Sequence, residues 1–396
     1  MSILFWVLAI LTVTLAALQL RTAVQVRGHY RPIDSDVPSE RPAVSVLVPL
    51  VGAVPGLRQR LDTLVKATRG GDLTHLGDQL LLVPAAADDP THTVAEDLRR
   101  AHPTRDISIV LAHPEGGQLS TGQALDAALD HADHAMIACM ADDVVLDPAN
   151  LDEGVRLAGV KDAGAVFAIP YYAGAGSIGG RLVAAFNNYG LVPTLASLAT
   201  QGAPRFIIDG FWVTTRTALD VAGGLAHHGG GHGLGSAIGR AMRAAGRRNR
   251  AMRRPVRREQ AALAALEAAR DVLGHLAPLR AQGAILFTML ALSWNALALA
   301  LVAGLVGWAA PGIAAGVAAA VVGVTVLLRS AVVLVLNRGA YRALPRTRYL
   351  ATTLLFEAAV GPWLCLIATV RGPVSAAATP TPTGPGNGTR PSPRRR

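Results

Sequence analysis

The chain contains very little cysteine and lysine. Its 396 residues include two cysteines, Cys139 and Cys365, which are too few for a disulfide framework or a cysteine-based zinc site. Lys66 and Lys161 are the only lysines, so arginine carries nearly all of the 37 positive charges. The excess of arginine and alanine favours a bacterial source. A net charge of +10 suits an anionic membrane surface or nucleic acid.

Long apolar runs, by contrast, are abundant, with 51% hydrophobic residues. Residues 3–20 are uncharged and long enough to cross a bilayer. No basic residue precedes them, which argues against a secretory signal peptide. Arg21, Arg27 and Arg31 follow, and such charges stay on the cytosolic side. We therefore expect a transmembrane anchor over residues 1–20, followed by a cytosolic region.

A second apolar region, residues 283–371, is expected to form about three more membrane helices. The candidates are 284–309, 313–336 and 350–370, of which the last is either a span or a re-entrant segment. Arg329 and Glu357 fall at membrane depth, where they could pair and help to line a lipid cavity; alternatively, Arg329 could reach the interface. Residues 372–396 are rich in Pro, Gly and Thr and are expected to be disordered. The overall expectation is a multi-pass protein of the bacterial inner membrane.

The region 43–256 between these parts alternates apolar strands with amphipathic helices. Strands are expected at 44–50, 79–85, 107–112 and 135–140, and helices near 55–67, 91–101 and 121–132. This alternation predicts an α/β domain with a mostly parallel sheet. Ligands of such sheets bind beyond the carboxyl ends of the strands.

Carboxylates follow two of these strands. Asp142 and Asp143 come directly after 135–140, and Asp88 and Asp89 follow 79–85. A carboxylate pair can hold Mg²⁺ or Mn²⁺ against a nucleotide diphosphate. The alternative for the first pair is a strand-end turn that leads through Asp147-Pro148 into a capped helix. Because side chains alternate direction beyond a strand, we expect only Asp143 to face the cleft and to bind a metal weakly.

Segments spread over residues 1–370 resemble the family 2 and family 21 glycosyltransferases. The segments are "VSVLVPLVGAVPGL", "LLLVPAAADDP", "IACMADDVVLDPANL", "AIPYYAG", "FIIDGFWVTTRTALDVAGGL" and "IGRAMRAAGRRNRAM". The likeness is strongest to ceramide glucosyltransferases and bacterial hopanoid-associated transferases. It implies a GT-A fold, a UDP-sugar donor and a membrane lipid acceptor.

The catalytic motifs implied by this resemblance are degenerate here. Ala85–Ala87 stand where the family has an acid for the nucleoside, and Ala141 takes the place of the first metal-motif Asp. Leu234 and Gly235 fall on the Glu-Asp pair that supplies the base, and no carboxylate lies between Asp220 and Glu259. The family's Arg-Trp motif matches residues 271–280, which contain no Trp; His275 or Arg280 could be a remnant of it.

These departures bear on catalysis, because inverting sugar transfer needs a base for the acceptor hydroxyl. His232, with His227 and His228, is a weak substitute base; a flexible polar loop is the alternative. The favoured hypothesis is a catalytically impaired homologue, a pseudoenzyme that serves as a binding or scaffold subunit of a membrane protein complex. The alternative is an active transferase that moves a sugar from a nucleotide sugar to a membrane lipid to form a glycolipid, with a rearranged active site.

Nine arginines lie between Arg240 and Arg258. We expect five of them to face anionic inner-leaflet lipids: Arg247, Arg248, Arg250, Arg253 and Arg254. Nucleic acid is not expected as a partner, because no aromatic residues are interleaved with these arginines to stack on bases. Residues 257–282 are expected to form an amphipathic helix on the membrane surface, or alternatively an ordinary helix that faces the core.

Overall fold

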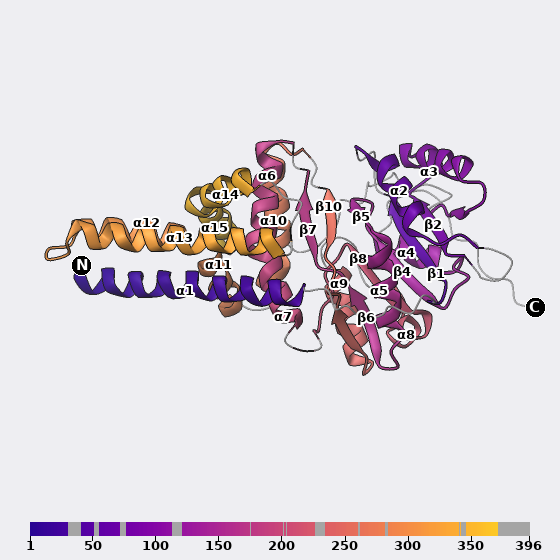
Figure 1. Ribbon diagram of the computed structural model, residues 1–396, viewed down its shortest axis with the longest axis horizontal. Helices are drawn as coiled ribbons and strands as arrows, with labels where there is room; N and C mark the ends of the chain where they lie inside the picture. The colour runs from indigo at the N-terminus through magenta and orange to yellow at the C-terminus, as the bar shows by residue number, and fades with distance from the viewer. Residues whose placement is uncertain are drawn as a thin grey trace, which may run out of the picture.

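The computed structural model combines an α/β domain with a bundle of apolar helices, which lie at opposite ends of its long axis (Figure 1). The structure describes residues 1–30, 41–50, 55–71, 77–112, 121–174, 176–200, 202, 204–225, 234–259, 262–281, 284–339, 341 and 346–370.

The α/β domain is built on a seven-stranded sheet in the order β3-β2-β1-β4-β8-β6-β9. These strands are β1 Val44–Leu50, β2 Gln79–Pro84, β3 Asp106–Ile109, β4 Met136–Met140, β6 Ala163–Phe167, β8 Phe211–Thr215 and β9 Arg248–Ala251. Strands β1 to β4 are mutually parallel, which confirms the predicted parallel sheet. Strand β8 runs antiparallel to both β4 and β6, so its first residues lie at the same edge as the carboxyl end of β4.

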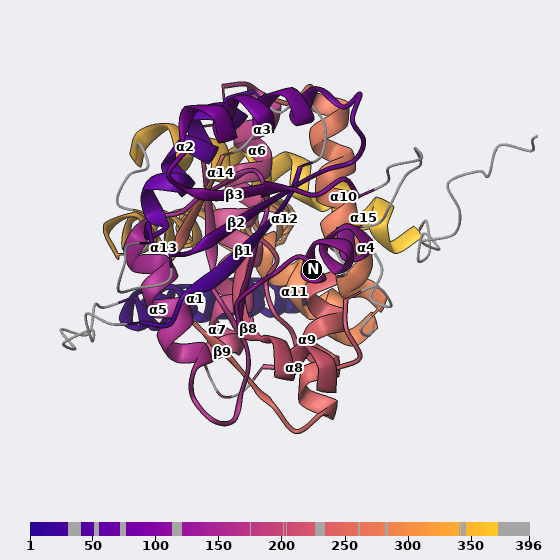
Figure 2. The ribbon, with the colours of Figure 1, turned by 90° about the vertical axis from the view of Figure 1, so that its right-hand side faces the viewer.

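Helices cover both faces of this sheet (Figure 2). One face packs against α2 Leu57–Ala67, α3 Pro90–Ala101 and α5 Pro148–Ala158, and the other against α4 Thr121–Leu129, α8 Arg216–Val221 and α9 Leu234–Ala244. Successive side chains of a strand point to opposite faces. In β4, Met136, Ala138 and Met140 accordingly join one core, while Ile137 and Cys139 join the other. Burial on both sides explains why the central strands read as unbroken apolar runs.

A second sheet, in the order β5-β10-β7, lies beside the carboxyl end of β4. Its strands are β5 Val144–Val145, β7 Pro170–Ala173 and β10 Val256–Glu259. Strand β10 corrects the predicted amphipathic helix, which was expected to begin at 257. Residues 257–259 instead pair with β7 and β5, and helix α10 spans Ala265–Ala281. The backbone hydrogen bonds of two neighbouring strands here override the helical preference of the local sequence.

The helical part consists of long helices and shorter helices between them and the α/β domain. Helices α1 Ser2–His29, α12 Ala296–Ala309 and α13 Ala315–Gly339 pack on one another and extend away from the domain (Figure 1). The remaining helices are α6 Ile178–Phe186, α7 Val192–Thr200, α11 Ala284–Trp294, α14 Arg346–Leu355 and α15 Gly361–Val370, with π-helical segments at Asn187–Leu191 and Phe356–Val360.

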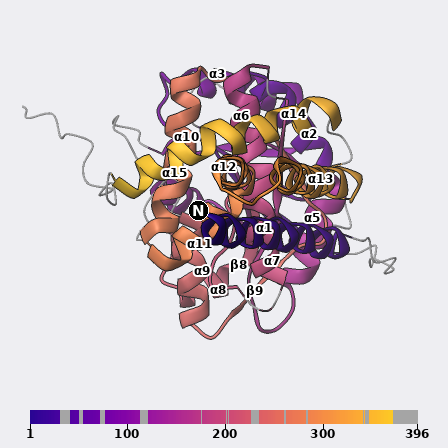
Figure 3. The same cartoon turned by 90° about the vertical axis from the view of Figure 1, so that its left-hand side faces the viewer.

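Within the part of the chain that the structure describes, four helical stretches are long and apolar enough to cross a membrane: 2–29, 178–200, 315–339 and 350–369. Residues 178–200 are mostly buried within the protein, so their apolar surface is already covered. The predicted span 284–309 is divided by Asn295, which lies between α11 and α12. Helix α15 runs lengthwise in Figure 3, where α12 and α13 are seen nearly end-on, so it crosses them. Whether residues 350–370 span the membrane or re-enter it stays a prediction.

Arg329 of α13 and Glu357 form a buried ion pair inside this helical part, which confirms the predicted pairing. The Arg329 Nε donates to both Glu357 oxygens at 2.8 Å, and the two side chains are 1% and 3% exposed. Arg329 Nη2 also donates to the backbone oxygen of Tyr189 at 3.3 Å. Three segments far apart in the sequence are thereby joined at one point.

Candidate functional site

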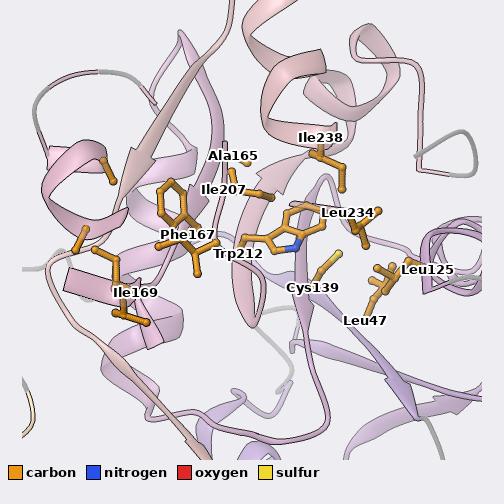
Figure 4. Close-up of a cluster of buried hydrophobic side chains, with 14 of the residues drawn as sticks. Leu47, Leu125, Cys139, Ala165, Phe167, Ile169, Ile207, Trp212, Leu234 and Ile238 are labelled. Carbon is orange, nitrogen blue, oxygen red and sulfur yellow. The ribbon is translucent and has the colours of Figure 1, made fainter. Parts of the chain in front are cut away.

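A pocket of about 220 Å³ opens where the carboxyl ends of β1 and β4 meet the beginning of β8. Its lining residues are Pro49, Thr121, Leu125, Cys139, Met140, Ala141, Asp209, Gly210, Trp212, Leu234 and Arg258. Leu125, Cys139, Trp212 and Leu234 form an apolar floor that continues into the core (Figure 4). Burial raises the pKa of the Cys139 thiol, which therefore stays neutral. The two charged lining residues are Asp209 and Arg258.

The residues after β4 are held by contacts on both sides. The Ala141 N–H donates to the Gly210 oxygen at 2.8 Å, and Arg60 Nε donates to the Asp142 oxygen at 2.7 Å. Arg60 is 3% exposed and also pairs with Glu259 at 2.9 Å. Asp147 precedes α5, as the turn alternative predicted, and its N–H donates to Asn150 Oδ1 at 3.3 Å. The backbone of this turn is thus held by hydrogen bonds to Gly210, which precedes β8, and to Arg60 of α2, which itself pairs with Glu259 of β10.

Arg258 of β10 binds the carboxylate of Asp143. Its Nε lies 3.0 and 2.9 Å from the two carboxylate oxygens, and its Nη2 lies 2.7 Å from Oδ2. The guanidinium also lies 5.4 Å from the ring centre of Tyr172 and donates to its hydroxyl at 3.3 Å. These neighbours keep the pKa of Arg258 above its usual value against the opposing effect of burial. Arg258 therefore presents a permanent positive charge to the pocket.

Asp209 is the carboxylate that lines the pocket, and the sequence interpretation missed it. Asp143 had been expected to face the cleft, but the lining residues contain its partner Arg258 instead. Burial raises the pKa of Asp209 to about 6, although Arg258 and a hydrogen bond from the Gly235 N–H act in the opposite direction. A lone acid within the apolar stretch "FIIDGFW" was the available signal, because an acid in such surroundings needs a reason.

Gly210 and Gly235 allow Asp209 to occupy this place. Gly210 has φ 134°, a backbone conformation that other residues rarely adopt. A Cβ added to Gly235 would lie 2.5 Å from Asp209 Oδ1 and 2.6 Å from the Ile207 oxygen. The carboxylate of Asp209 thus fills the space that a side chain at position 235 would take.

Two of the residues at this turn are unsuited to a divalent metal. Ala141 offers no ligand, and the carboxylate of Asp143 is already bound through both oxygens by Arg258. Among the described residues, no group of three His, Cys, Asp or Glu side chains is placed to hold a metal ion. A cation would have to displace Arg258 and overcome the repulsion of its charge.

The other two predicted acids, Asp88 and Asp89, do not line the pocket. Asp89 caps helix α3, where its Oδ1 accepts from the Thr91 N–H at 2.8 Å and from the Thr91 hydroxyl at 2.7 Å. Asp88 is exposed in the turn before it. His232, with His227 and His228, lies outside the described residues. The structure thus assigns a helix-capping role to one member of the second acid pair.

The predicted arginine surface is partly neutralised by nearby acids. Arg248 and Arg250 pair with Asp162 at 3.6 and 2.7 Å, and Arg254 lies 3.9 Å from Glu153. Arg247 donates to the Lys161 oxygen at 3.0 Å, and the Arg253 N–H donates to Glu153 at 2.7 Å. Lipid binding by these arginines stays a prediction.

A solved structure supports the fold. A mannosyltransferase from Pyrobaculum calidifontis, in complex with GDP-Man and Mn²⁺, is 18% identical with a TM-score of 0.51; the match covers 88% of this chain and 98% of that one. Glucosyl-3-phosphoglycerate synthase from Mycobacterium tuberculosis, in complex with Mn²⁺, UDP and phosphoglyceric acid, is 18% identical with a TM-score of 0.38, covering 62% of this chain and 83% of that one. No curated protein matches the chain.

The α/β domain has the GT-A fold that the sequence resemblance implied. The model of glycosyl transferase family 21 matches residues 4–374, which is nearly the whole chain. The chain therefore belongs to glycosyl transferase family 21.

Proposed function

We propose that this protein transfers a sugar from a nucleotide sugar to a lipid at the inner face of a bacterial membrane, without a divalent cation. The observation that carries the proposal is the pocket at the end of β4, which pairs the fixed cation Arg258 with the carboxylate Asp209. Of the two hypotheses left open by the sequence, the active transferase with a rearranged site is the one that this pairing supports.

The place of the pocket supports a nucleotide-sugar donor. Ligands of open α/β sheets bind beyond the carboxyl ends of the strands, and the pocket opens at that edge. The structurally similar mannosyltransferase holds GDP-Man, and the family resemblance implies a UDP-sugar. A nucleoside diphosphate in this pocket would bring its negative charge to the guanidinium of Arg258, which can donate two parallel hydrogen bonds to phosphate oxygens.

Short contacts between the pocket and the apolar helices support a lipid acceptor. Tyr172 of β7 contacts Arg258, and its N–H donates to Asn188 at 2.7 Å in the π-helical segment between α6 and α7. The adjacent Tyr171 stacks on Tyr341, just beyond α13, with ring centres 5.5 Å apart. One strand therefore separates the pocket from helices that are apolar enough to lie in a bilayer. Ceramide is one acceptor to test.

A binding or scaffold subunit without catalysis remains the second candidate. Asp143 neutralises part of the charge of Arg258, and the apolar Leu234 lines the pocket where the family resemblance implies an acid. A pseudoenzyme of this kind would bind the donor and release no nucleoside diphosphate.

The test uses the full-length protein in nanodiscs that contain phosphatidylglycerol and ceramide, with EDTA present. UDP-glucose and GDP-mannose are supplied separately, and released nucleoside diphosphate and labelled glycolipid are measured. Sugar transfer in EDTA that is lost in Arg258→Ala and retained in Arg257→Ala is the expected result. Arg257 is a matched control because it lies on the same strand but pairs with Glu259. Donor binding without product would instead establish the pseudoenzyme.

A further inference from the structure

Asp209 is a partly buried carboxylate at the wall of the pocket, next to the first turn of helix α9. It lines the pocket beside Arg258, and its carboxylate accepts a hydrogen bond from the Gly235 N–H. We infer that Asp209 is the general base of the transfer, which removes the proton from the hydroxyl group of the lipid acceptor. The inference rests on the proposed function and names the residue that replaces the missing family acid.

The reaction step balances as follows. The acceptor oxygen forms a bond to the anomeric carbon of the sugar while its proton moves to a carboxylate oxygen of Asp209. The bond from that carbon to the diphosphate oxygen breaks, and its electron pair leaves with the nucleoside diphosphate. The charge that develops there faces Arg258, and Asp209 later returns its proton to water. Cation and base thus act on the two ends of one displacement.

The geometry beside Gly235 explains how the site can contain a carboxylate although the position of the family acid is a glycine. The carboxylate comes from Asp209. Helix α9 presents the Gly235 N–H to the carboxylate, and the missing side chain leaves room for it. The Ile207 N–H donates to the Gly235 oxygen at 3.2 Å, so the segment before β8 is tied to the beginning of α9. The acid therefore comes from the β8 side of the pocket instead of from the helix.

The charge state of Asp209 suits this role. Its pKa of about 6 leaves it ionised at pH 7 and closer to the operating pH than an ordinary aspartate. Burial raises this pKa, whereas the positive charge of Arg258 and the Gly235 N–H lower it. Because the base must be ionised, the rate should fall about tenfold for each pH unit below 6.

The primary test compares Asp209→Asn with the unchanged protein in the nanodisc assay. The variant keeps the size of the side chain and should lower kcat by about 10²–10⁴-fold. Its Kd for UDP should not rise and should fall at most a few-fold, since Arg258 makes the diphosphate contact and loses one neighbouring negative charge. The acidic limb of the pH profile should disappear. Glu153→Gln is the matched control, because Glu153 is a largely buried carboxylate that accepts backbone N–H bonds outside the pocket.

A second variant separates chemistry from folding. Asp209→Ala leaves a space that formate can enter, and added formate should restore a measurable part of the lost rate; a residue needed only for structure would show no such rescue. An Asp209→Asn variant that turns over like the wild type overturns the assignment of the base alone. The wild-type protein could also bind UDP and yet release neither UDP from UDP-glucose nor GDP from GDP-mannose. That result would overturn both the proposed function and the assignment of the base.

Discussion

Two arginine–carboxylate pairs, one in each half of the molecule, show what burial does to the same chemistry. Arg329 and Glu357 are sealed among helices, with side chains 1% and 3% exposed. Arg258 and Asp143 are 20% and 24% exposed beside the pocket. The buried pair joins helix α13 to the π-helical segment Phe356–Val360 and so contributes to the fold. The partly exposed pair keeps the guanidinium of Arg258 at the surface of the pocket, where an anionic ligand can also bind it.

The buried pair should give the largest effect on stability when one partner is removed. Glu357→Ala leaves the Arg329 guanidinium buried without its counter-charge, which typically costs about 3–5 kcal/mol. Replacing both residues with Met should cost much less, because no charge is then stranded. Thermal unfolding in nanodiscs measures both. The control is Glu96→Ala, which removes an exposed pair on α3 and should cost at most about 1 kcal/mol. A loss for Glu357→Ala no larger than this control would contradict the comparison.

The partly exposed pair should matter for binding instead of folding. Arg258→Ala removes charge-assisted hydrogen bonds to the diphosphate; the loss of one such bond, worth about 1.5–3 kcal/mol, should alone raise the Kd for UDP in EDTA by roughly 10–150-fold. Calorimetry measures the affinity, and Arg257→Ala should leave it nearly unchanged. Equal affinity in the two variants would show that the diphosphate does not meet Arg258.

The packing of Asp209 against Gly235 predicts a third effect. Gly235→Ala adds a Cβ within 2.6 Å of the Ile207 backbone oxygen, which cannot move aside as a side chain can. Overpacking of this kind costs about 1–3 kcal/mol of stability, and the displaced carboxylate should also lower the transfer rate. Unfolding and turnover are measured together. A variant that is fully stable and active would mean that Asp209 does not depend on this contact.

Asp143→Asn should have the smallest effect, and its sign is informative. Loss of the negative charge leaves Arg258 free to act on the ligand alone, so UDP affinity in EDTA should rise a few-fold. If Asp143 were a metal ligand, the same change would instead weaken binding in Mn²⁺ and have no effect in EDTA. Calorimetry under both conditions decides between these outcomes.

The parallel half of the sheet was predictable, and the other half was not. Strands β1, β2 and β4 are apolar runs buried on both faces, and their observed bounds fall within one residue of the predicted ones. Strand β10, "VRRE", has charged residues at three of its four positions and exists because β5 and β7 flank it. Arg258 was therefore read as part of a helix. Long-range pairing of this kind leaves no local pattern in the sequence.

The candidate site was predictable to the same extent. The acids after β4 were located correctly, because the direction of a buried strand fixes where its end lies. Arg258, which binds Asp143, and Asp209 were not located, since they come from segments 115 and 66 residues further along the chain than Asp143. The absence of an acid at Gly235 suggested a lost activity. The space left by that glycine, which Asp209 occupies, was visible only in three dimensions.

The most direct test of the account is the affinity of the full-length protein for UDP and GDP, measured by calorimetry in EDTA and again in Mn²⁺. If Arg258 takes the place of a divalent metal ion, UDP or GDP should bind in EDTA. The Kd of that nucleotide should change by less than about threefold when Mn²⁺ replaces the chelator. Binding that appears only with Mn²⁺ would show that a metal displaces Arg258 from Asp143, and would contradict the account.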